Sequence, residues 1–360
     1  MGENSEYYNS LIQKRKDAIE TVKNTLPQHA HGYINECLLR YQVNTAYNYA
    51  HDIQLFYMYI KEKNPLCKNK DMKDIPIDYV ESLGPQDINE FQTYVLAGHK
   101  PDKKGNVKST GERSVARRMA AVRNYFKYLI RYDYLKIDPT LKAVPKKKET
   151  EKKDIRRLNN NQVGSLMNAV STVKSASYHS QVMSEITAKR DLAIMTLFLN
   201  TGIRVSECVG LDLADVNFTE KQIKIVRKGG GIDYLFINKD IEKTLKDYIK
   251  NERPSLLNGE KDPALFISLK HRRLSVRSIQ HMIEKYGKNT GLSEKLTPHK
   301  LRRTYGTALY NETGDIYMVA DVLGHKDINT TSKHYAGIEE KHKRQAANIN
   351  LYGNKTDNTN

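Results

Sequence analysis

The chain has 360 residues and a formal net charge of +17. This length allows two domains with ordinary cores, and no apolar run approaches the roughly 18 residues that cross a membrane. So much positive charge indicates a polyanionic partner, most simply nucleic acid, although a basic ribosome-associated protein would share it. Its cysteines are too few and too scattered for a disulfide framework or a zinc site, and they suggest a reducing cytoplasm: Cys37, Cys67 and Cys208.

The first 140 residues are predicted to be helical. Residues 1–29 are polar and helix-prone, with a sparse apolar stripe that could dock on the next element or on another subunit. Further on, Val43-Asn44-Thr45 offers an N-cap for a helix whose apolar residues recur three or four apart. The same spacing continues, so residues 30–140 are predicted to form a domain of four or five helices.

One of these helices is rich in arginine. Its apolar face includes Val115, Met119 and Val122, and the arginines lie elsewhere on it. A solvated face is the ordinary explanation, but the first turns carry little acid, which favours contact with phosphate or the major groove. Four side chains are therefore candidate DNA contacts: Arg113, Arg117, Arg118 and Arg123.

Residues 141–154 are charged, poor in apolar residues and punctuated by Pro145, which predicts an interdomain linker. A basic linker suits a protein that closes around a DNA duplex, and a plain solvated tether is the alternative. The candidate DNA contacts in the linker are Lys146, Lys147 and Lys148.

A second domain is predicted over residues 155–337. It contains a strongly apolar helix that ends in Asn200-Thr201-Gly202, a C-cap signal, and Arg204 lies just beyond it. A charged residue at the end of a buried helix usually has a partner. Glu207 is one candidate, so a structural ion pair is the plain interpretation.

Two short strands are predicted next, around Ile223–Val226 and Tyr234–Ile237. The segment between them, Arg227 to Gly231, has three glycines, which let a hairpin tip move and come close to a ligand. Lys228 at this tip could reach into a groove, although a lysine beside glycines is usually an ordinary turn residue.

The stretch from Thr297 to Tyr335 contains several groups that can serve a phosphate. Pro298 suits the first helical position after Thr297, which places His299 and Arg302 on one face of one helical turn. Arginine offers a fork that matches two phosphate oxygens, and histidine can exchange a proton near neutral pH. His325 and Tyr335, a possible nucleophile, follow. A His-x-x-Arg pair alone is a common surface feature, and a chain with 23 tyrosines gives one tyrosine little weight.

The order of these pieces resembles the tyrosine recombinases, also called the phage-integrase family. The resemblance rests on four short boxes with a hairpin lysine, Lys228, between the first two: Thr201–Glu207, His299–Arg303, Leu323–His325 and Lys333–Tyr335. Many members carry a second histidine where this chain has Arg303, so a catalytic role for that position is in doubt. Tyr335 lies ten residues after His325, within the family's range. No separate arm-site-binding domain is recognisable.

The resemblance implies a mainly α-helical, two-domain, C-shaped clamp on duplex DNA. Its core-binding (SAM-like) helical domain would be residues 30–140, and its catalytic domain, with a small antiparallel β-sheet, residues 155–337. Members act as tetramers on two DNA sites without metal, nucleotide or other cofactor. A homotetramer in the synaptic complex is therefore expected here, with residues 338–360 as a tail that packs in trans.

The resemblance also implies roles for the boxed residues. Tyr335 would attack a backbone phosphate, and Arg204, Arg302 and His325 would stabilise the charge on its oxygens. His299 is the candidate for accepting the phenolic proton, and Lys228 is the candidate acid for the leaving oxygen. Further candidate DNA contacts are Thr45, Arg227, Arg277 and Lys300.

The expected function is site-specific recombination between double-stranded DNA sites, with a possible accessory DNA-bending protein and no membrane partner. The N-terminal helix, taken as separate, and the basic charge favour an integrase or excisionase of a mobile element. Xer-type chromosome dimer resolution and DNA inversion are the alternatives. Relaxation by a type IB topoisomerase-like enzyme and a non-catalytic DNA-binding regulator are more distant ones.

Overall fold

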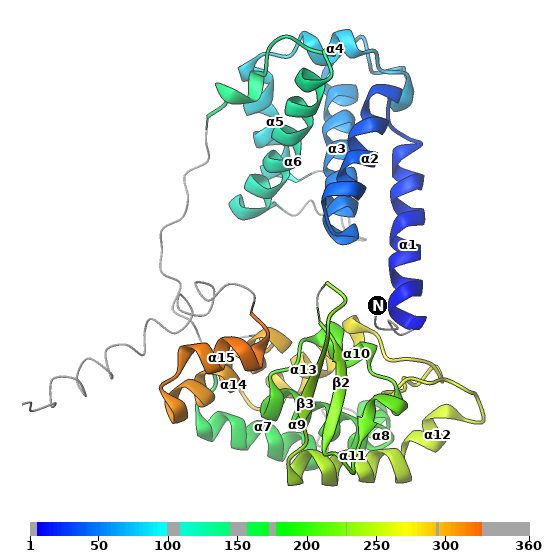
Figure 1. The fold of residues 1–360 in the computed structure, drawn as a ribbon, viewed down its shortest axis with the longest axis vertical. Helices are drawn as coiled ribbons and strands as arrows, with labels where there is room; N and C mark the ends of the chain where they lie inside the picture. The colour runs from blue at the N-terminus through cyan, green and yellow to red at the C-terminus, as the bar shows by residue number, and fades with distance from the viewer. Residues whose placement is uncertain are drawn as a thin grey trace, which may run out of the picture. The chain divides into compact units, whose positions relative to one another are not determined.

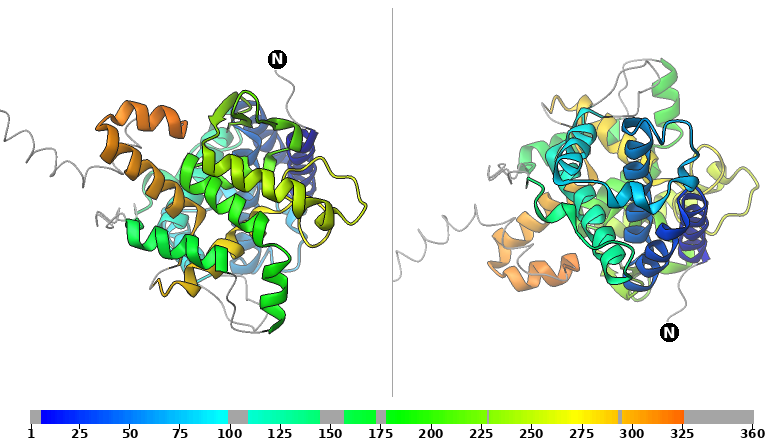
Figure 2. Two further views of the ribbon diagram at one scale, coloured as in Figure 1. Left: turned by 90° about the horizontal axis from the view of Figure 1, so that it is seen from below. Right: turned by 90° about the horizontal axis from the view of Figure 1, so that it is seen from above.

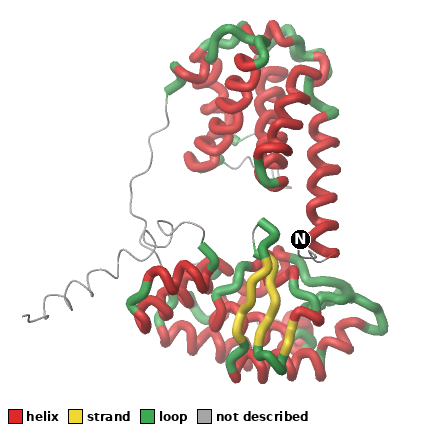
Figure 3. Tube along the Cα trace, in the orientation of Figure 1, coloured by secondary structure: helices red, strands yellow, loops and turns green. Residues whose placement is uncertain are grey.

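The computed structural model describes residues 6–98, 109–144, 157–172, 178–227, 229–292 and 295–325 (Figure 1). The chain divides into two compact units, Ser5–Lys152 and Lys153–Asn360, the second including Met1–Asn4. The described residues are mainly helical, with one small antiparallel sheet (Figure 3), as the sequence predicts. None of their helices combines the length and the apolar character that crossing a membrane requires.

The first unit is a helical domain. Its elements are α1 (Glu6–Lys23), α2 (Gln28–Arg40), α3 (Val43–Lys63), α4 (Ile77–Glu81), α5 (Pro85–Ala97) and α6 (Glu112–Arg131), with 3-10 turns at Met72–Asp74 and Pro139–Leu141. Helices α3, α5 and α6 pack on one another around Phe56, Phe91 and Phe126, which are fully buried. The apolar spacing of three and four residues therefore predicts these helices correctly, because one stripe of each faces the common core.

Helix α1 belongs to this helical unit. It packs along α3 (Figure 2), and Ile19 and Val22 are buried in the same apolar cluster as the other helices. The guanidinium of Arg15 lies 4.2 Å from the ring centroid of Tyr47 on α3. Of the two possibilities left open by the sequence, docking on the following elements is the one that the structure shows.

The start of α3 differs from the sequence prediction. Its N-cap is Gln42, whose side chain makes no capping hydrogen bond, and Thr45 lies inside the first turn. Because α2 ends at Arg40, the chain has only two residues in which to reverse direction, and both are extended. Tertiary packing of two adjoining helices therefore overrides the local preference of Asn and Thr for the cap.

A buried carboxylate joins α3 to α6. Asp52 is 4% exposed and forms a two-point ion pair with Arg117, in which Nη2 lies 2.8 Å from Oδ1 and Nη1 contacts Oδ2. The Nε of Arg118 lies 3.8 Å from the same carboxylate. Burial raises the pKa of Asp52, while Arg117 opposes that shift. Two side chains predicted to contact DNA thus have an internal partner, which the sequence did not reveal.

We expect Arg117→Ala to destabilise the protein by about 3 kcal/mol, because it leaves the buried carboxylate of Asp52 without its two-point partner. Urea unfolding followed by far-UV circular dichroism measures the loss. Glu20→Ala is the matched control, since it removes an exposed ion pair with Lys23 whose contribution is about 0.5 kcal/mol or less. Equal effects of the two substitutions would contradict the structural role of the ion pair between Arg117 and Asp52.

The second unit surrounds helix α9. Its elements are α7 (Asn160–Thr172), α8 (Tyr178–Glu185), α9 (Ala188–Thr201), α10 (Val205–Gly210), a 3-10 turn (Leu213–Asp215), β1 (Val216–Asn217), β2 (Gln222–Val226), β3 (Ile232–Phe236), α11 (Lys239–Asn251), α12 (Arg253–Leu257), α13 (Val276–Asn289), α14 (Pro298–Thr313) and α15 (Ile316–Leu323). Helices α7, α11 and α14 pack against α9, so its apolar run is buried on nearly all sides, as its sequence predicts.

The sheet has the order β1-β2-β3 and is antiparallel throughout. In the hairpin between β2 and β3, the N–H of Arg227 donates to the carbonyl of Gly231 at 2.7 Å. Gly229 and Gly230 have φ of 109° and 87°, which residues with a Cβ rarely adopt, so the predicted glycine tip is structurally required. The two-residue strand β1 is too short to have a sequence pattern of its own.

Candidate active site

Arg204 is placed by the abrupt end of α9. Gly202 caps that helix in the left-handed conformation, with φ of 61°. A Cβ on Gly202 would lie 2.7 Å from Cδ1 of Tyr305 on α14 and 2.8 Å from Cδ2 of Leu323 on α15. These two side chains can approach the end of α9 this closely because residue 202 is glycine. Only Ile203 separates Gly202 from Arg204, which is the N-cap residue immediately before α10.

His299 and Arg302 are placed by the start of α14. The Thr297 side chain accepts a hydrogen bond from the N–H of Lys300, and Pro298 occupies the first helical position, as predicted. His299 and Arg302 are three positions apart, and Arg302 is 5% exposed. Arg302 therefore points into the interior of the unit and needs internal acceptors for its donors.

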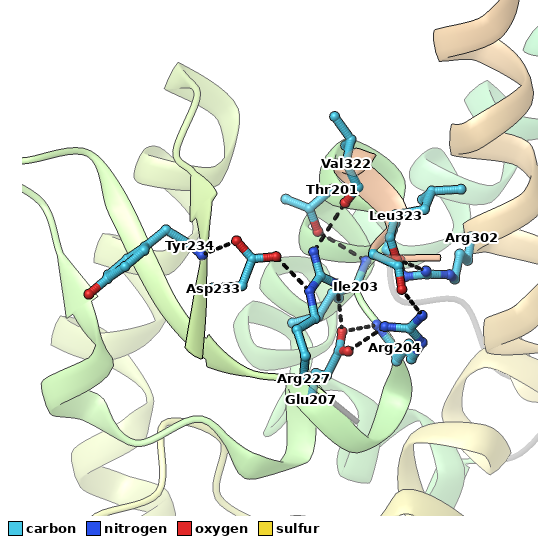
Figure 4. Close-up of polar contacts among 12 residues, drawn as sticks. Thr201, Ile203, Arg204, Glu207, Arg227, Asp233, Tyr234, Arg302, Val322 and Leu323 are labelled. Carbon is cyan, nitrogen blue, oxygen red and sulfur yellow. Dashed lines mark hydrogen bonds and ion pairs between the residues drawn. The ribbon is translucent and has the colours of Figure 1, made fainter. Parts of the chain in front are cut away.

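Those acceptors lie at the end of α15. Three successive carbonyls there accept hydrogen bonds from three arginines (Figure 4). Val322 O lies 3.1 Å from Nη2 of Arg227, Leu323 O accepts from Arg302, and Gly324 O lies 2.7 Å from Nη2 of Arg204. The last carbonyls of a helix have no intrahelical partner and carry partial negative charge, so they suit guanidinium groups. We call these three oxygens the carbonyl cluster.

Arg302 also connects the carbonyl cluster to α9. Its Nη1 lies 2.5 Å from the carbonyl of Gly202, while its Nη2 contacts Leu323. One guanidinium thus joins the C-terminal ends of two helices that are far apart in sequence. His325 is the second residue after α15 and directly follows Gly324, whose carbonyl accepts from Arg204.

Glu207 is a second acceptor shared by arginines. Its side chain is 2% exposed, and its Oε1 lies 2.7 Å from Nη1 of Arg204. Its Oε2 accepts from the backbone N–H of Arg204 at 2.9 Å and from Nη1 of Arg227 at 3.3 Å. The structural ion pair between Arg204 and Glu207 is therefore present. It orients Arg204 and still leaves that side chain 25% exposed.

The charges around His299 favour its neutral form. Its side chain is exposed on one side, but partial burial lowers its pKa, and the positive charges of Arg303, Arg302 and Arg204 lower it further. A neutral imidazole can accept a proton at pH 7. His299 lies in the first turn of α14, one helical turn before Arg302, whose guanidinium contacts the carbonyl cluster.

The structure thus brings Arg204 and Arg302 together at the carbonyl cluster, with His299 one helical turn before Arg302, and the backbone of His325 directly follows Gly324. The other two residues singled out in the sequence, Lys228 and Tyr335, lie outside the described residues, as do the linker lysines Lys146, Lys147 and Lys148. Within the described ranges, no group of three or more His, Cys, Asp or Glu side chains is arranged to hold a metal ion.

The remaining DNA-contact candidates fall into two sets. Arg113 and Arg277 are exposed, and Thr45, Arg123 and Lys300 are partly buried, so their roles stay predictions. Arg227 instead is held by internal partners, among them Asp233, whose Oδ2 lies 2.8 Å from its Nε. The one sequence signal for that pair is the opposite charge of two residues that flank the glycine tip.

Comparison with known proteins agrees with this geometry. Residues 156–342 match the model of the phage integrase family. A tyrosine recombinase XerC from Caldanaerobacter subterraneus is 30% identical over 85% of this chain and 81% of its own length. A tyrosine recombinase XerS from Streptococcus pneumoniae is 27% identical over 90% of this chain and 96% of its own length.

Solved structures show the same fold at lower identity. The XerH recombinase bound to its difH substrate superposes with a TM-score of 0.61 at 19% identity, covering 85% of this chain and 79% of that one. A lambda integrase dimer bound to a core site gives 0.58 at 16% identity, covering 85% and 93%. The chain belongs to the phage integrase family and is a tyrosine-type site-specific DNA recombinase.

We expect Arg303→Gln to raise the pKa of His299 toward its ordinary value of 6.5, because a neighbouring positive charge is removed. An NMR titration of histidine-labelled protein, with His299 assigned by substitution, measures this directly. Arg272→Gln is the control, since it removes an exposed positive charge that does not act on His299. An unchanged or lowered pKa in Arg303→Gln would contradict the electrostatic account.

Proposed function

We propose that Tyr335 attacks a backbone phosphate of duplex DNA and forms a 3′-phosphotyrosyl bond. The phenolic oxygen bonds to phosphorus, the bond from phosphorus to the 5′-oxygen breaks, and that oxygen leaves as a hydroxyl. The covalent bond conserves the phosphodiester energy, so a second 5′-hydroxyl can reverse the step without a nucleotide cofactor. The observation that carries this proposal is the approach of Arg204 and Arg302, from different helices, to one carbonyl cluster beside His299.

The two arginines supply electrostatic stabilisation in this proposal. The transition state concentrates negative charge on the non-bridging oxygens, which guanidinium forks bind well. Arg204 has five N–H donors, and its side-chain contacts with Glu207 and Gly324 use two of them. Because the side chain is also partly exposed, it retains donors for an incoming phosphate. Losing one such donor commonly costs about 2.7–4 kcal/mol of barrier.

Two proton transfers complete the step. A phenol has a pKa near 10 in water, so it needs a nearby base or positive charge. His299, with its lowered pKa, is the acceptor that we propose, directly or through water. A base must be neutral to act, so cleavage should fail as the pH falls through the pKa of His299. Lys228 is our proposed donor to the leaving 5′-oxygen.

We propose that the two units close around one DNA site and that four chains assemble on two sites. The net charge of +17 suits a DNA duplex, and solved relatives include a lambda integrase tetramer bound to a Holliday junction. The basic linker and the tail from residue 338 onward remain our candidates for DNA contact and for packing in trans.

The two candidate biological roles are integration or excision of a mobile element and Xer-type chromosome dimer resolution. The sequence favours a mobile-element integrase partly through a separate N-terminal helix, yet α1 packs into the helical unit. The curated relatives include XerC and XerS recombinases, and the XerS match spans nearly the whole of both chains. Xer-type resolution is therefore the role that this observation favours. A plasmid with two copies of the site also separates a recombinase from a topoisomerase. A recombinase exchanges strands between the two copies, whereas a topoisomerase only relaxes the plasmid.

We expect Tyr335→Phe to bind its DNA site with affinity unchanged within roughly twofold, because phosphate contacts dominate binding. It should form no covalent protein–DNA adduct in denaturing gels. Tyr317→Phe is the matched control, an exposed tyrosine on α15 whose loss should leave adduct formation intact. Adduct formation by Tyr335→Phe would show that another residue is the nucleophile.

We expect Lys228→Ala to slow cleavage of a normal site roughly 100- to 10,000-fold, the usual contribution of a general acid. A site with sulfur in place of the leaving 5′-oxygen needs no proton, so its cleavage should slow far less. Single-turnover rates on the two substrates measure the difference. Equal slowing of both would remove Lys228 from the acid role.

A further inference from the structure

Arg227 has contacts with three separate parts of the catalytic unit. Its Nε lies 2.8 Å from Oδ2 of Asp233 on β3, and its Nη1 lies 3.3 Å from Oε2 of Glu207 on α10. Its Nη2 lies 3.1 Å from the carbonyl of Val322 at the end of α15. The side chain is 13% exposed. All three guanidinium nitrogens are therefore committed to internal acceptors, which leaves little for a DNA phosphate.

The backbone of Arg227 also belongs to the hairpin. Its N–H donates to Gly231 at 2.7 Å, and its carbonyl accepts from the N–H of Gly230 at 3.0 Å. The same residue thus closes the hairpin through its backbone and anchors it to α10 and α15 through its side chain. Lys228 is the next residue along the chain, so this anchor is one residue from the proposed acid.

The packing of Gly324 shows how closely this anchor is fitted. Gly324 has φ of 60°, and a Cβ there would lie 2.9 Å from both Cζ and Nε of Arg227. The guanidinium therefore lies directly against the backbone that follows α15. Gly324 both ends the helix in the left-handed conformation and makes room for Arg227, which explains why this position carries a glycine.

Charge couples Arg227 to Arg204. The two guanidiniums share the buried carboxylate of Glu207, and they contact carbonyls only two residues apart in the carbonyl cluster. Removing Arg227 leaves Glu207 paired with Arg204 alone, and it removes the side-chain hydrogen bond that links the hairpin to the carbonyl of Val322 on α15. The body of the hairpin would still be held by its backbone hydrogen bonds and by the buried side chains of Ile223 and Ile225, but its tip would lose this side-chain anchor.

We propose that Arg227 is a positioning residue, which anchors the hairpin to the carbonyl cluster and so sets where Lys228 is presented. It replaces our sequence-based assignment of Arg227 to DNA contact. This inference rests on the proposed function, in which Lys228 protonates the leaving oxygen. Arg227 itself touches neither substrate nor reacting atoms in this account.

The test compares Arg227→Gln with the wild-type full-length chain on normal sites and on sites with a 5′-sulfur leaving group. We expect cleavage of the normal site to fall roughly 100-fold, since a displacement of about 1 Å costs that much. Cleavage of the sulfur site should fall far less, and affinity for uncleaved DNA should stay within roughly twofold. The profile should match that of Lys228→Ala. Arg272→Gln, an exposed arginine on a loop, should change neither rate.

Two further variants guard against a folding defect. Asp233→Asn leaves Arg227 in place but removes the negative charge of its Nε partner, so it should show the same selective loss at a smaller size. Arg227→Lys keeps the charge but has no fork to reach three acceptors, so it should not restore the normal-site rate. Circular dichroism of each variant confirms that it is folded.

Equal slowing of both substrates by the folded variants would overturn the inference, because a general structural role has that effect. The inference would also be overturned, in favour of DNA contact, by a tenfold or greater loss of DNA affinity with no change in the ratio of cleavage rates on the normal and sulfur-containing sites. Failure of Lys228→Ala to discriminate between the substrates would remove its basis. Failure of the proposed function has a different signature from failure of this inference. In that case the wild type would form no covalent adduct with DNA, or Tyr335→Phe would still form one.

Discussion

The attraction between three guanidinium groups and the carbonyl end of α15 holds the second unit together around its candidate site. The last carbonyls of a helix lack intrahelical donors, and the N–H groups of a buried arginine need acceptors. Hydrogen bonds between them offset the cost of removing both groups from water. Arg302 ties this end to α9, and Arg204 and Arg227 tie it to α10 and the hairpin. The ends of α9 and α15, the starts of α10 and α14, and the hairpin therefore meet near these oxygens.

Sequence reasoning succeeds where function coincides with a local backbone signal. Gly202 ends α9 and Thr297-Pro298 begins α14, so the positions of Arg204, His299 and Arg302 follow from helix boundaries. The mainly helical fold, the hairpin and the buried α9 are likewise visible as apolar periodicity and glycine placement. The resemblance then joins boxes that lie far apart in the chain.

Sequence reasoning fails where a long side chain chooses among distant partners. Arg117 and Arg227 look alike as basic residues near a DNA-binding surface, yet they face Asp52 and Asp233. Neither pair has a fixed sequence spacing by which it could be predicted. A backbone carbonyl is present at every residue, so the sequence does not indicate which one will act as an acceptor. The same limit applies to α1, whose sparse apolar stripe gives its face but not the surface on which it docks.

Because the carbonyl cluster consists of backbone oxygens, any amino acid at positions 322 and 323 supplies the same acceptors. Evolutionary drift at these side chains is therefore tolerated by the cluster itself. A one-residue insertion or deletion within α15 is different, because it rotates the helix end by about 100° and moves all three oxygens together. The length of this short helix is therefore constrained by the cluster, in addition to the constraint that the buried side chains of Val319 and Leu323 place on its composition.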